Sequence, residues 1–342
     1  MMKEFGSDFH YISNYPLKQN SLTGIFHNML LLANGRQCIV ELIRQNGWKR
    51  MWFPDFFCYE VIDSIKTLTR IEVMLYPDGP FQEDERIIMN LPFKEGDVLL
   101  RMNYFGTRDV RTENNIPIPV IEDHTHDLLG PWALNSNADW CIVSLRKSLP
   151  LPEGGGMWSP KGHRIFDRIN MSEQNEEIAQ IRWKAMQTKT DYLEDIVSDK
   201  QLYRKLFLET EDWFNLSEPS MIDKKSKNYI EYFDISDWQA TKRKNWQLLY
   251  HLVETEVLIP ENEKCTPFSF IILTNNTEER DLLRKRLLEK SVYPAILWNV
   301  PNSTTPENKD FSHRMLSIHC DGRYTEKDIR QLAIILNTSL KK

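Results

Sequence analysis

The chain has 342 residues, enough for about two domains of ordinary size. Hydrophobic residues make up 41% and charged residues 27%, a balance typical of a globular protein with a sizeable core. The 43 Lys and Arg residues against 49 Asp and Glu give a net charge of −6, which argues against a protein whose main task is neutralising phosphate backbones. No apolar run approaches the roughly 18 residues that a membrane-spanning helix needs.

Residues 1–6 contain no apolar core of a signal peptide. The five cysteines are scattered, with no C-x-x-C pair: Cys38, Cys58, Cys141, Cys265 and Cys320. This number and spacing fit reduced thiols rather than a disulfide framework or a structural zinc site. We therefore expect a cytoplasmic protein with no nucleic-acid partner and no membrane partner.

The first half of the chain alternates strand-like with helix-like segments. A helix capped by Asn34 and ended by Gly47 is predicted from the apolar residues at helical spacing between them, and a second helix is predicted at 61–68. Strands are predicted at 49–54, 71–76, 97–104, 119–121 and 140–144. Near-continuous apolar strands separated by helices indicate a parallel sheet covered on both faces, with its chemistry at the carboxyl ends of the strands.

From about Phe166 to Val253 the sequence is helical, charged and rich in aromatic residues, and a smaller α+β block follows. In that block, strands are predicted at 267–273, 293–298 and 315–319. Thr277 is predicted to cap a helix to about residue 290, Thr325 to cap a last helix at 326–336, and residues 299–310 to form a loop. We expect a large α/β domain in residues 1–235, including a helical segment at 166–235, and a small α+β domain in residues 236–342.

Two polar clusters directly follow predicted strands: residues 122–127, and residues 144–147 with Glu153 and three glycines after them. A lysine that emerges from a buried strand end, such as Lys147, has a lowered pKa and can act as a nucleophile or form a Schiff base. An aspartate at a neighbouring strand end, Asp123, can hold a cationic ring nitrogen, and the helix N-terminus at Gly35 can bind an anion. Pyridoxal phosphate (PLP) requires these three groups together.

Several motifs occur in an order that resembles one known family. They are Asn34-Gly35-Arg36-Gln37-Cys38, Phe53-Pro54-Asp55-Phe56-Phe57-Cys58-Tyr59, Glu122-Asp123-x-x-His126, Ser144-x-x-Lys147 with Glu153-Gly154-Gly155, and the segments 293–294 and 320–328. The sequence resembles the DegT/StrS-type sugar aminotransferases, a branch of the fold-type-I PLP-dependent enzymes. The resemblance runs from about Gly24 to the C-terminus. It implies the fold-type-I α/β fold, with a mostly parallel sheet in a large domain and a smaller α+β C-terminal domain.

The resemblance implies roles for particular residues. Lys147 would hold PLP as a Schiff base and later move a proton, and Asp123 would pair with the pyridinium nitrogen. Gly35, Arg36 and Ser144 would bind the phosphate, His126 would lie near the ring, and Phe57 would stack on it, with Phe56 and Tyr59 as the other candidates. Asn103 and Tyr104, after another strand, are candidates for substrate contact, and no metal site is expected.

The implied reaction is transfer of an amino group from a donor, usually glutamate, to a keto substrate. In this family the acceptor is a nucleotide-linked keto-sugar, as in polysaccharide biosynthesis, and the active sites lie at the interface of a homodimer. The sequence departs from the family pattern in three places. Arg36 stands where a small hydroxyl residue is usual, the spacing from Ser144 to Lys147 is shorter, and Cys58 falls at the strict position of the stacking aromatic residue.

Two other classes of protein stay open. The first is a protein with the PLP-enzyme fold but without transaminase activity, acting as a binding or regulatory module. The second is a metal-dependent hydrolase that uses Asp123, His124 and His126, because a His-x-His pair beside carboxylates can ligate a metal ion.

Overall fold

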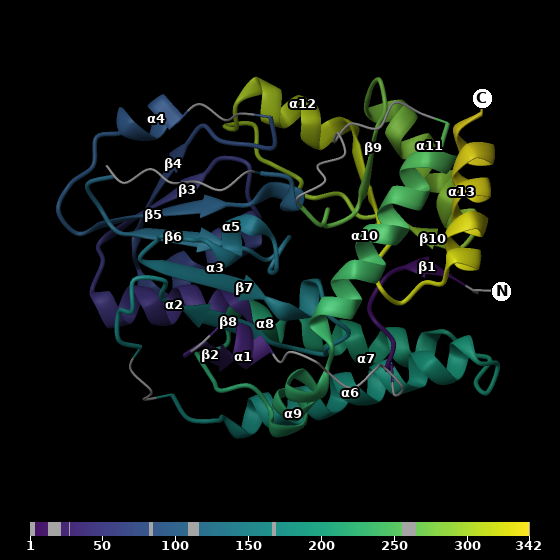
Figure 1. The fold of residues 1–342 in the computed structure, drawn as a ribbon, viewed down its shortest axis with the longest axis horizontal. Coiled ribbons are helices and arrows are strands. Elements are labelled where there is room, and N and C mark those ends of the chain that lie inside the picture. Colours follow the sequence, from purple (N-terminus) through teal and green to yellow (C-terminus); the bar gives the residue numbers. More distant parts are fainter. Residues whose placement is uncertain are drawn as a thin grey trace.

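The computed structural model describes residues 4–12, 22–26, 28–81, 85–108, 116–165, 169–254 and 265–341. A seven-stranded sheet in the order β2-β8-β7-β6-β5-β3-β4 forms its largest layer (Figure 1). Its strands are β2 (Leu30–Leu32), β3 (Arg50–Pro54), β4 (Glu72–Tyr76), β5 (Asp97–Met102), β6 (Val120–Asp123), β7 (Trp140–Ser144) and β8 (Gly155–Trp158). Strands β4, β3, β5, β6 and β7 are parallel, and β8 and β2 are antiparallel to their neighbours. The predicted mostly parallel sheet is confirmed.

Both faces of this sheet are buried, as the apolar strands predict. Successive residues of β5 alternate between two cores, with Val98 and Leu100 in one and Leu99 in the other. The first core includes α2 (Gly35–Asn46) and α3 (Tyr59–Thr69), and the second includes α6 (Glu173–Leu193), α7 (Gln201–Glu211) and α9 (Lys224–Tyr232). Short helices lie between these elements: α1 (Leu22–Ile25), α4 (Glu85–Met89), α5 (Pro131–Leu134) and α8 (Trp213–Leu216). Within the described residues, no helix combines the length and the apolar character needed to cross a membrane.

The C-terminal block lies to the right of the large sheet in Figure 1 and has its own core. Its strands β9 (Phe270–Leu273) and β11 (Met315–Ile318) are antiparallel and share this core with α11 (Thr277–Glu289) and α13 (Glu326–Leu340). The N-terminal strand β1 (Phe5–Gly6) pairs in parallel with β10 (Val292–Tyr293) of this block. Helix α10 (Ile235–Leu252) joins the two parts, because Trp238 belongs to a core of the large sheet and Trp246 to the C-terminal core. The division at residue 235 falls at the start of α10 and stays a prediction.

The helix predicted after Asn34 is confirmed with both of its caps. The Asn34 side chain accepts a hydrogen bond from the Gln37 N–H, and Gly47 adopts the left-handed conformation with φ of 66°. The Thr325 cap is also confirmed, and it forms a capping box with Asp328.

The sequence predictions for the C-terminal block are wrong in three details. The strand predicted at 293–298 is only β10, because Pro294 cannot donate a ladder hydrogen bond. The loop predicted at 299–310 ends in α12 (Pro306–Arg314), where Pro306 occupies the first turn of the helix. The cap of α11 is Asn276 rather than Thr277, since the Asn276 side chain accepts the Glu279 N–H.

Candidate active site

A cavity lies at the carboxyl ends of the parallel strands and encloses about 920 Å³, part of it open to solvent. Its walls come from the start of α2, the residues after β3, the ends of β6 and β7, α7, α8 and the C-terminal block. All the cofactor-binding positions predicted from the sequence line it together: Gly35, Arg36, Phe57, Asp123, His126, Ser144 and Lys147. The strand order β7-β6-β5 brings these residues to one place, although they are spread over more than a hundred positions of the sequence.

Asp123 ends β6, and only 7% of its surface is exposed. Its Oδ1 accepts a hydrogen bond from the Thr125 N–H at 2.9 Å. Thr125 Oγ1 accepts in turn from the Ser144 N–H at 2.9 Å, which ties the end of β6 to the end of β7. Burial raises the pKa of Asp123, and within the described part of the chain its carboxylate has no ion-pair partner. The carboxylate is therefore fixed at the cavity and lacks the positive group that would stabilise its charge.

Lys147 ends a single 3₁₀ turn, Leu145–Lys147, directly after β7. Its side chain is exposed to the cavity rather than packed, although protein surrounds the cavity. The adjacent Arg146 guanidinium, followed by burial, lowers the pKa of Lys147 to about 8. Arg146 and Arg182 each donate to one oxygen of Glu211, both at 3.1 Å. An amine with this pKa is neutral and nucleophilic in a larger fraction near pH 7 than an ordinary lysine.

The first turn of α2 borders the cavity with backbone N–H groups that the helix cannot use. Asn34 Oδ1 accepts the Gln37 N–H at 2.9 Å, and Asn34, Gly35 and Arg36 at the start of the helix all line the cavity. Asn34 Nδ2 is buried without a hydrogen-bond partner among the described residues. The Gly35 Cα lies so close to β7 that an added Cβ would be 3.0 Å from the Ser144 Cβ. This corner can bind an anion between a helix N-terminus and a serine hydroxyl.

The Arg36 side chain is turned toward α8 rather than spread over the helix start. Its Nη1 donates to the Phe214 carbonyl oxygen and, at 2.8 Å, to Asn215 Oδ1. Its buried Nε has no partner within the described residues, and the residue still lines the cavity. Arg36 thus lines the cavity while its Nη1 anchors α8.

Aromatic side chains form a further part of the cavity wall. Of the three aromatic candidates, only Phe57 lines the cavity, whereas Phe56 is fully buried and Tyr59 lies outside the lining. The His126 ring stacks with Phe268 at a centroid distance of 4.2 Å and with Trp298 at 5.7 Å.

The His126 ring is also fixed by a hydrogen bond, because its Nδ1 accepts the Phe105 N–H at 2.9 Å. Burial lowers the pKa of His126 to about 3, so the ring is neutral and carries its proton on Nε2.

A second cavity, of about 850 Å³, lies on the other side of Lys147. The two cavities share the residues Arg146, Lys147, Phe268 and Leu297. The second one is also lined by Asp8 from the N-terminal segment, by Arg182 of α6, and by His319 and Arg323 of the C-terminal block. Lys147 therefore faces one compartment that holds Asp123 and another that is rich in arginine.

Asn103 and Tyr104 are not brought to either cavity. Tyr104 is fully buried and its hydroxyl donates to the Phe56 carbonyl oxygen at 2.6 Å. Asn103 is 1% exposed, and its Oδ1 accepts the Arg108 N–H. Both residues hold the loop after β5 in place, which is a structural role rather than the substrate contact predicted for them.

The three residues of the metal-hydrolase hypothesis do not come together. Asp123 and His126 line the first cavity, whereas His124 is directed to the other core, where its Nε2 lies 3.2 Å from Glu122 Oε2. His124, Glu122 and Cys141 form a group with ligand atoms within 4.8 Å of one another. Burial raises the pKa of the Cys141 thiol well above its ordinary value. Alternation of side chains at the end of β6 separates His124 from Asp123, and the turn at residues 125–126 brings His126 back to the side of Asp123.

Sequence reasoning missed several residues of the cavity. Thr125 occupies an unassigned position of the motif around Asp123, yet it links that residue to Ser144. Glu211, Phe268 and Trp298 also line the cavity. They lie far along the chain from the motifs, and no local pattern marks them.

Among known proteins, this chain has matches by structure but not by sequence. No protein-family model matches the chain, and no curated protein matches its sequence. Among solved structures, the PLP form of Spr1654 from Streptococcus pneumoniae, described as a sugar aminotransferase, has a TM-score of 0.65 at 9% identity and covers 99% of this chain and 99% of that chain. The aminotransferase PseC of Helicobacter pylori, which takes part in the biosynthesis of pseudoaminic acid, has a TM-score of 0.62 at 11% identity over 99% of this chain and 100% of that chain. DesI, solved with its TDP-sugar product, has a TM-score of 0.63 at 12% identity and covers 94% of this chain and 83% of that chain.

At these identities the likeness establishes the fold. The chain has the fold-type-I architecture of PLP-dependent transferases, as the sequence resemblance predicted.

Proposed function

We propose that this protein is a PLP-dependent aminotransferase that acts on a keto-sugar. One observation carries the proposal: Lys147, Asp123 and the start of α2 line the same cavity at the carboxyl ends of the strands. The supporting likeness is to sugar aminotransferases, one of which was solved in both a PLP form and a PMP form.

The residues of the cavity fit this cofactor. The Asp123 carboxylate is buried with a raised pKa and has no ion pair within the described part of the chain, so a pyridinium N–H would supply a positive partner. The Gly35 and Arg36 N–H groups, the Ser144 hydroxyl and the unpartnered Asn34 Nδ2 are the donors that a phosphate group needs. Phe57 offers an aromatic face in the same cavity.

When bound, the cofactor supplies an electron sink for the carbon that loses its proton. Lys147 would hold the cofactor through its Nζ, which is neutral in a larger fraction than an ordinary lysine, and its free amine would hold and move a proton. Asp123 would keep a proton on the ring nitrogen. The neutral His126 can donate from Nε2, and Phe268 and Trp298 restrict access of water to this side of the cavity.

The arginine-rich second cavity supports the proposed substrate class. Its lining by Arg146, Arg182 and Arg323 suits anionic groups, such as the carboxylates of an amino donor such as glutamate or the phosphates of a nucleotide-linked sugar. Lys147 borders this cavity as well, so a group held there can reach its amine.

We further propose a cytoplasmic homodimer with a large domain in residues 1–235 and a small domain in residues 236–342. Five free cysteines support the compartment. Leu208 on α7 and Leu216 on α8 are 68% and 60% exposed beside the cavity-lining residues Glu211 and Phe214, which supports a subunit contact there. Light scattering of the purified chain at several concentrations measures the subunit number.

An absorption spectrum tests the proposed activity. Purified protein mixed with PLP should show a band at ~410–430 nm that borohydride removes, with the reduced adduct on Lys147 by peptide mapping. Lys147→Ala should lack the band, whereas the matched variant Lys161→Ala should keep it, because Lys161 is exposed and pairs with Asp139 outside both cavities. Addition of glutamate should bleach the band.

A wild-type protein without the band, or with the band in Lys147→Ala, contradicts the proposal. A band that no amino donor bleaches would instead indicate the binding or regulatory module.

A further inference from the structure

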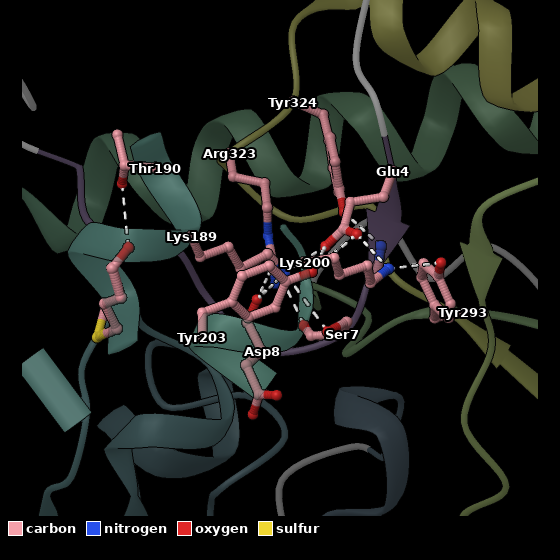
Figure 2. A network of polar contacts seen from close by, with 12 residues as sticks. Glu4, Ser7, Asp8, Lys189, Thr190, Lys200, Tyr203, Tyr293, Arg323 and Tyr324 are labelled. Atoms are coloured by element: carbon pink, nitrogen blue, oxygen red, sulfur yellow. Dashed lines mark hydrogen bonds and ion pairs between the residues drawn. The ribbon is translucent and has the colours of Figure 1, made fainter. Parts of the chain in front are cut away.

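The N-terminal segment crosses between α6 and α7 on one side and the C-terminal block on the other, and Figure 2 shows the polar network that holds it. Glu4 is 3% exposed and accepts from Lys189 at 2.7 Å and from Lys200 at 2.6 Å. Strand β1 adds the backbone pairing of Phe5 with Val292. A buried carboxylate between two lysines fixes the start of the chain against both parts of the molecule.

The same network fixes the backbone of Asp8. Its carbonyl oxygen accepts from Lys189 Nζ at 2.6 Å and from Arg323 Nη1 at 3.2 Å. Two residues earlier, the Gly6 N–H donates to the Tyr324 hydroxyl at 2.7 Å. The Arg323 guanidinium lies 3.9 Å from the centre of the Phe9 ring. Lys189 of α6 and Arg323 of the C-terminal block therefore hold the main chain at Asp8, so the position of its Cα is fixed.

The Asp8 carboxylate itself is not part of this network. Figure 2 shows it pointing away from the lysines, and the residue lines the second cavity. It is exposed, and within the described residues it forms no hydrogen bond or ion pair. Among the described lining residues it is the one carboxylate, in a cavity that also presents Arg146, Lys147 and Arg182.

We propose that Asp8 is a substrate-contacting residue whose carboxylate accepts hydrogen bonds from hydroxyl groups of the sugar substrate. This inference rests on the proposed function and goes beyond it, since it assigns a residue that selects the acceptor. An ionised carboxylate only accepts hydrogen bonds, so its ligand must bring donors. The neighbouring arginines and Lys147 disfavour an ammonium group at Asp8, and a carboxylate or phosphate of the ligand is repelled from direct contact with Asp8 and is drawn to the arginines instead. The donor must therefore be neutral, and hydroxyl groups are the neutral hydrogen-bond donors of a sugar.

Asp8→Ala tests this assignment with two matched ligands that differ in the sugar. Thymidine-diphosphate glucose carries sugar hydroxyls, whereas thymidine diphosphate carries the same nucleotide without them. Calorimetry on the PLP-loaded protein should show about tenfold weaker binding of the first ligand in the variant, equal to about 1.4 kcal/mol. Binding of the second should be unchanged or tighter, because a negative charge has been removed. Asp63→Ala on the exposed side of α3 is the matched control and should change neither affinity.

The rate at which glutamate bleaches the PLP band separates this proposal from the proposed function. Asp8→Ala should keep the band and at least the wild-type rate, since glutamate has no hydroxyl groups. Equal affinity of wild type and Asp8→Ala for the nucleotide sugar overturns the role of Asp8 while the bleaching stands. A wild-type protein that bleaches with glutamate but binds neither nucleotide overturns the sugar class and this proposal with it. Absence of the band overturns the proposed function, on which this proposal rests.

Discussion

At the scale of single residues, the charges around Lys147 decide how reactive its amine is. Arg146 is its neighbour in the chain and lowers its pKa, while Glu211, Cys58 and Asp8 oppose that effect. Arg146 and Arg182 hold Glu211 between them, and although burial raises the pKa of Glu211, the two arginines bring it to about 2. A carboxylate that stays charged at every working pH gives Lys147 a constant surrounding field.

Replacing Arg146 should make Lys147 a weaker nucleophile near neutral pH. In Arg146→Ala the repelling cation is gone, so the pKa of Lys147 rises from about 8 toward its ordinary value. Because only the neutral amine reacts with an aldehyde, the rate should rise with pH through a midpoint that lies higher in the variant, and at pH 7 it should be severalfold lower. The measurement is the rate of absorbance change after addition of pyridoxal, which carries no phosphate. The pH series runs from about 6 to about 10, which covers the lowered pKa of Lys147 and approaches that of an ordinary lysine.

Glu211→Gln should move the same midpoint down, because it removes a negative charge that favours the protonated amine. Arg330→Ala, on the exposed side of α13, should leave the profile unchanged. Identical midpoints in wild type and Arg146→Ala would show that burial alone sets the pKa.

The sequence could place Lys147 and Asp123 because each follows an apolar strand, and parallel strands end at one edge. It could not separate Phe57 from Phe56 and Tyr59, since the direction of a side chain after a strand depends on the loop that follows. It misassigned Tyr104 because a hydroxyl near a strand end looks available until its hydrogen bond to Phe56 is seen. Trp298 and Glu211 reach the cavity only through tertiary packing.

At the scale of elements, the start of α2 depends on close contact with its neighbours. An added Cβ at Gly35 would lie 3.0 Å from the Ser144 Cβ, and one at Gly155 would lie 2.2 Å from the Asn34 carbonyl carbon. The glycines after Glu153 therefore let β8 pass directly beneath the helix start. The sequence analysis compared these glycines with a family motif but did not predict β8, because two adjacent glycines weaken any strand pattern.

Gly35→Ala should weaken binding of PLP about tenfold. The new methyl group would push the helix start away from Ser144, and the two supply donors to one phosphate, each worth roughly 1.5–3 kcal/mol when the acceptor is charged. Equilibrium dialysis with PLP and with pyridoxal tests whether the loss comes from the phosphate contacts. Affinity for pyridoxal, which has no phosphate, should stay the same.

Gly47→Ala is the matched control at the other end of the same helix. Its φ is 66° and no atom lies within 4 Å of the added Cβ, so it should cost roughly 1–2 kcal/mol of stability without changing either affinity. A parallel loss of pyridoxal and PLP binding in Gly35→Ala would show that the substitution deforms the whole cavity rather than its phosphate corner.

At the scale of the whole molecule, the cavity is completed by contact between the C-terminal block and the large sheet. Asp55, directly after β3, is 5% exposed and accepts from the Thr305 N–H at 2.8 Å and from Asn308 Nδ2 at 2.7 Å. Thr305 and Asn308 cap and begin α12, and the Ser312 hydroxyl of that helix donates to the Trp298 carbonyl oxygen. The Asp55 carboxylate thus positions α12, which in turn holds Trp298 at the cavity wall.

Asp55→Ala should loosen this contact and destabilise the protein by roughly 2–4 kcal/mol. The substitution removes the acceptor of the Thr305 N–H and one of the two acceptors of Asn308 Nδ2, which also donates to the Asp78 carbonyl oxygen. Each buried unsatisfied donor costs about 1–3 kcal/mol. Urea unfolding measures the loss, and hydrogen exchange should show the Thr305 amide exchanging faster while amides of β6 keep their protection. Asp63→Ala on the exposed side of α3 is the matched control, and it should change stability by less than about 0.5 kcal/mol.

The same variant distinguishes two ways in which the cavity could be held together. If α12 positions Trp298, Asp55→Ala should also weaken PLP binding, although Asp55 does not line the cavity. If the stacking of His126 with Phe268 and Trp298 is sufficient, PLP affinity should stay at the wild-type value while stability alone falls. We expect the first result, because the stacked rings come from both parts of the molecule and Asp55, at the end of β3, accepts two hydrogen bonds from the start of α12.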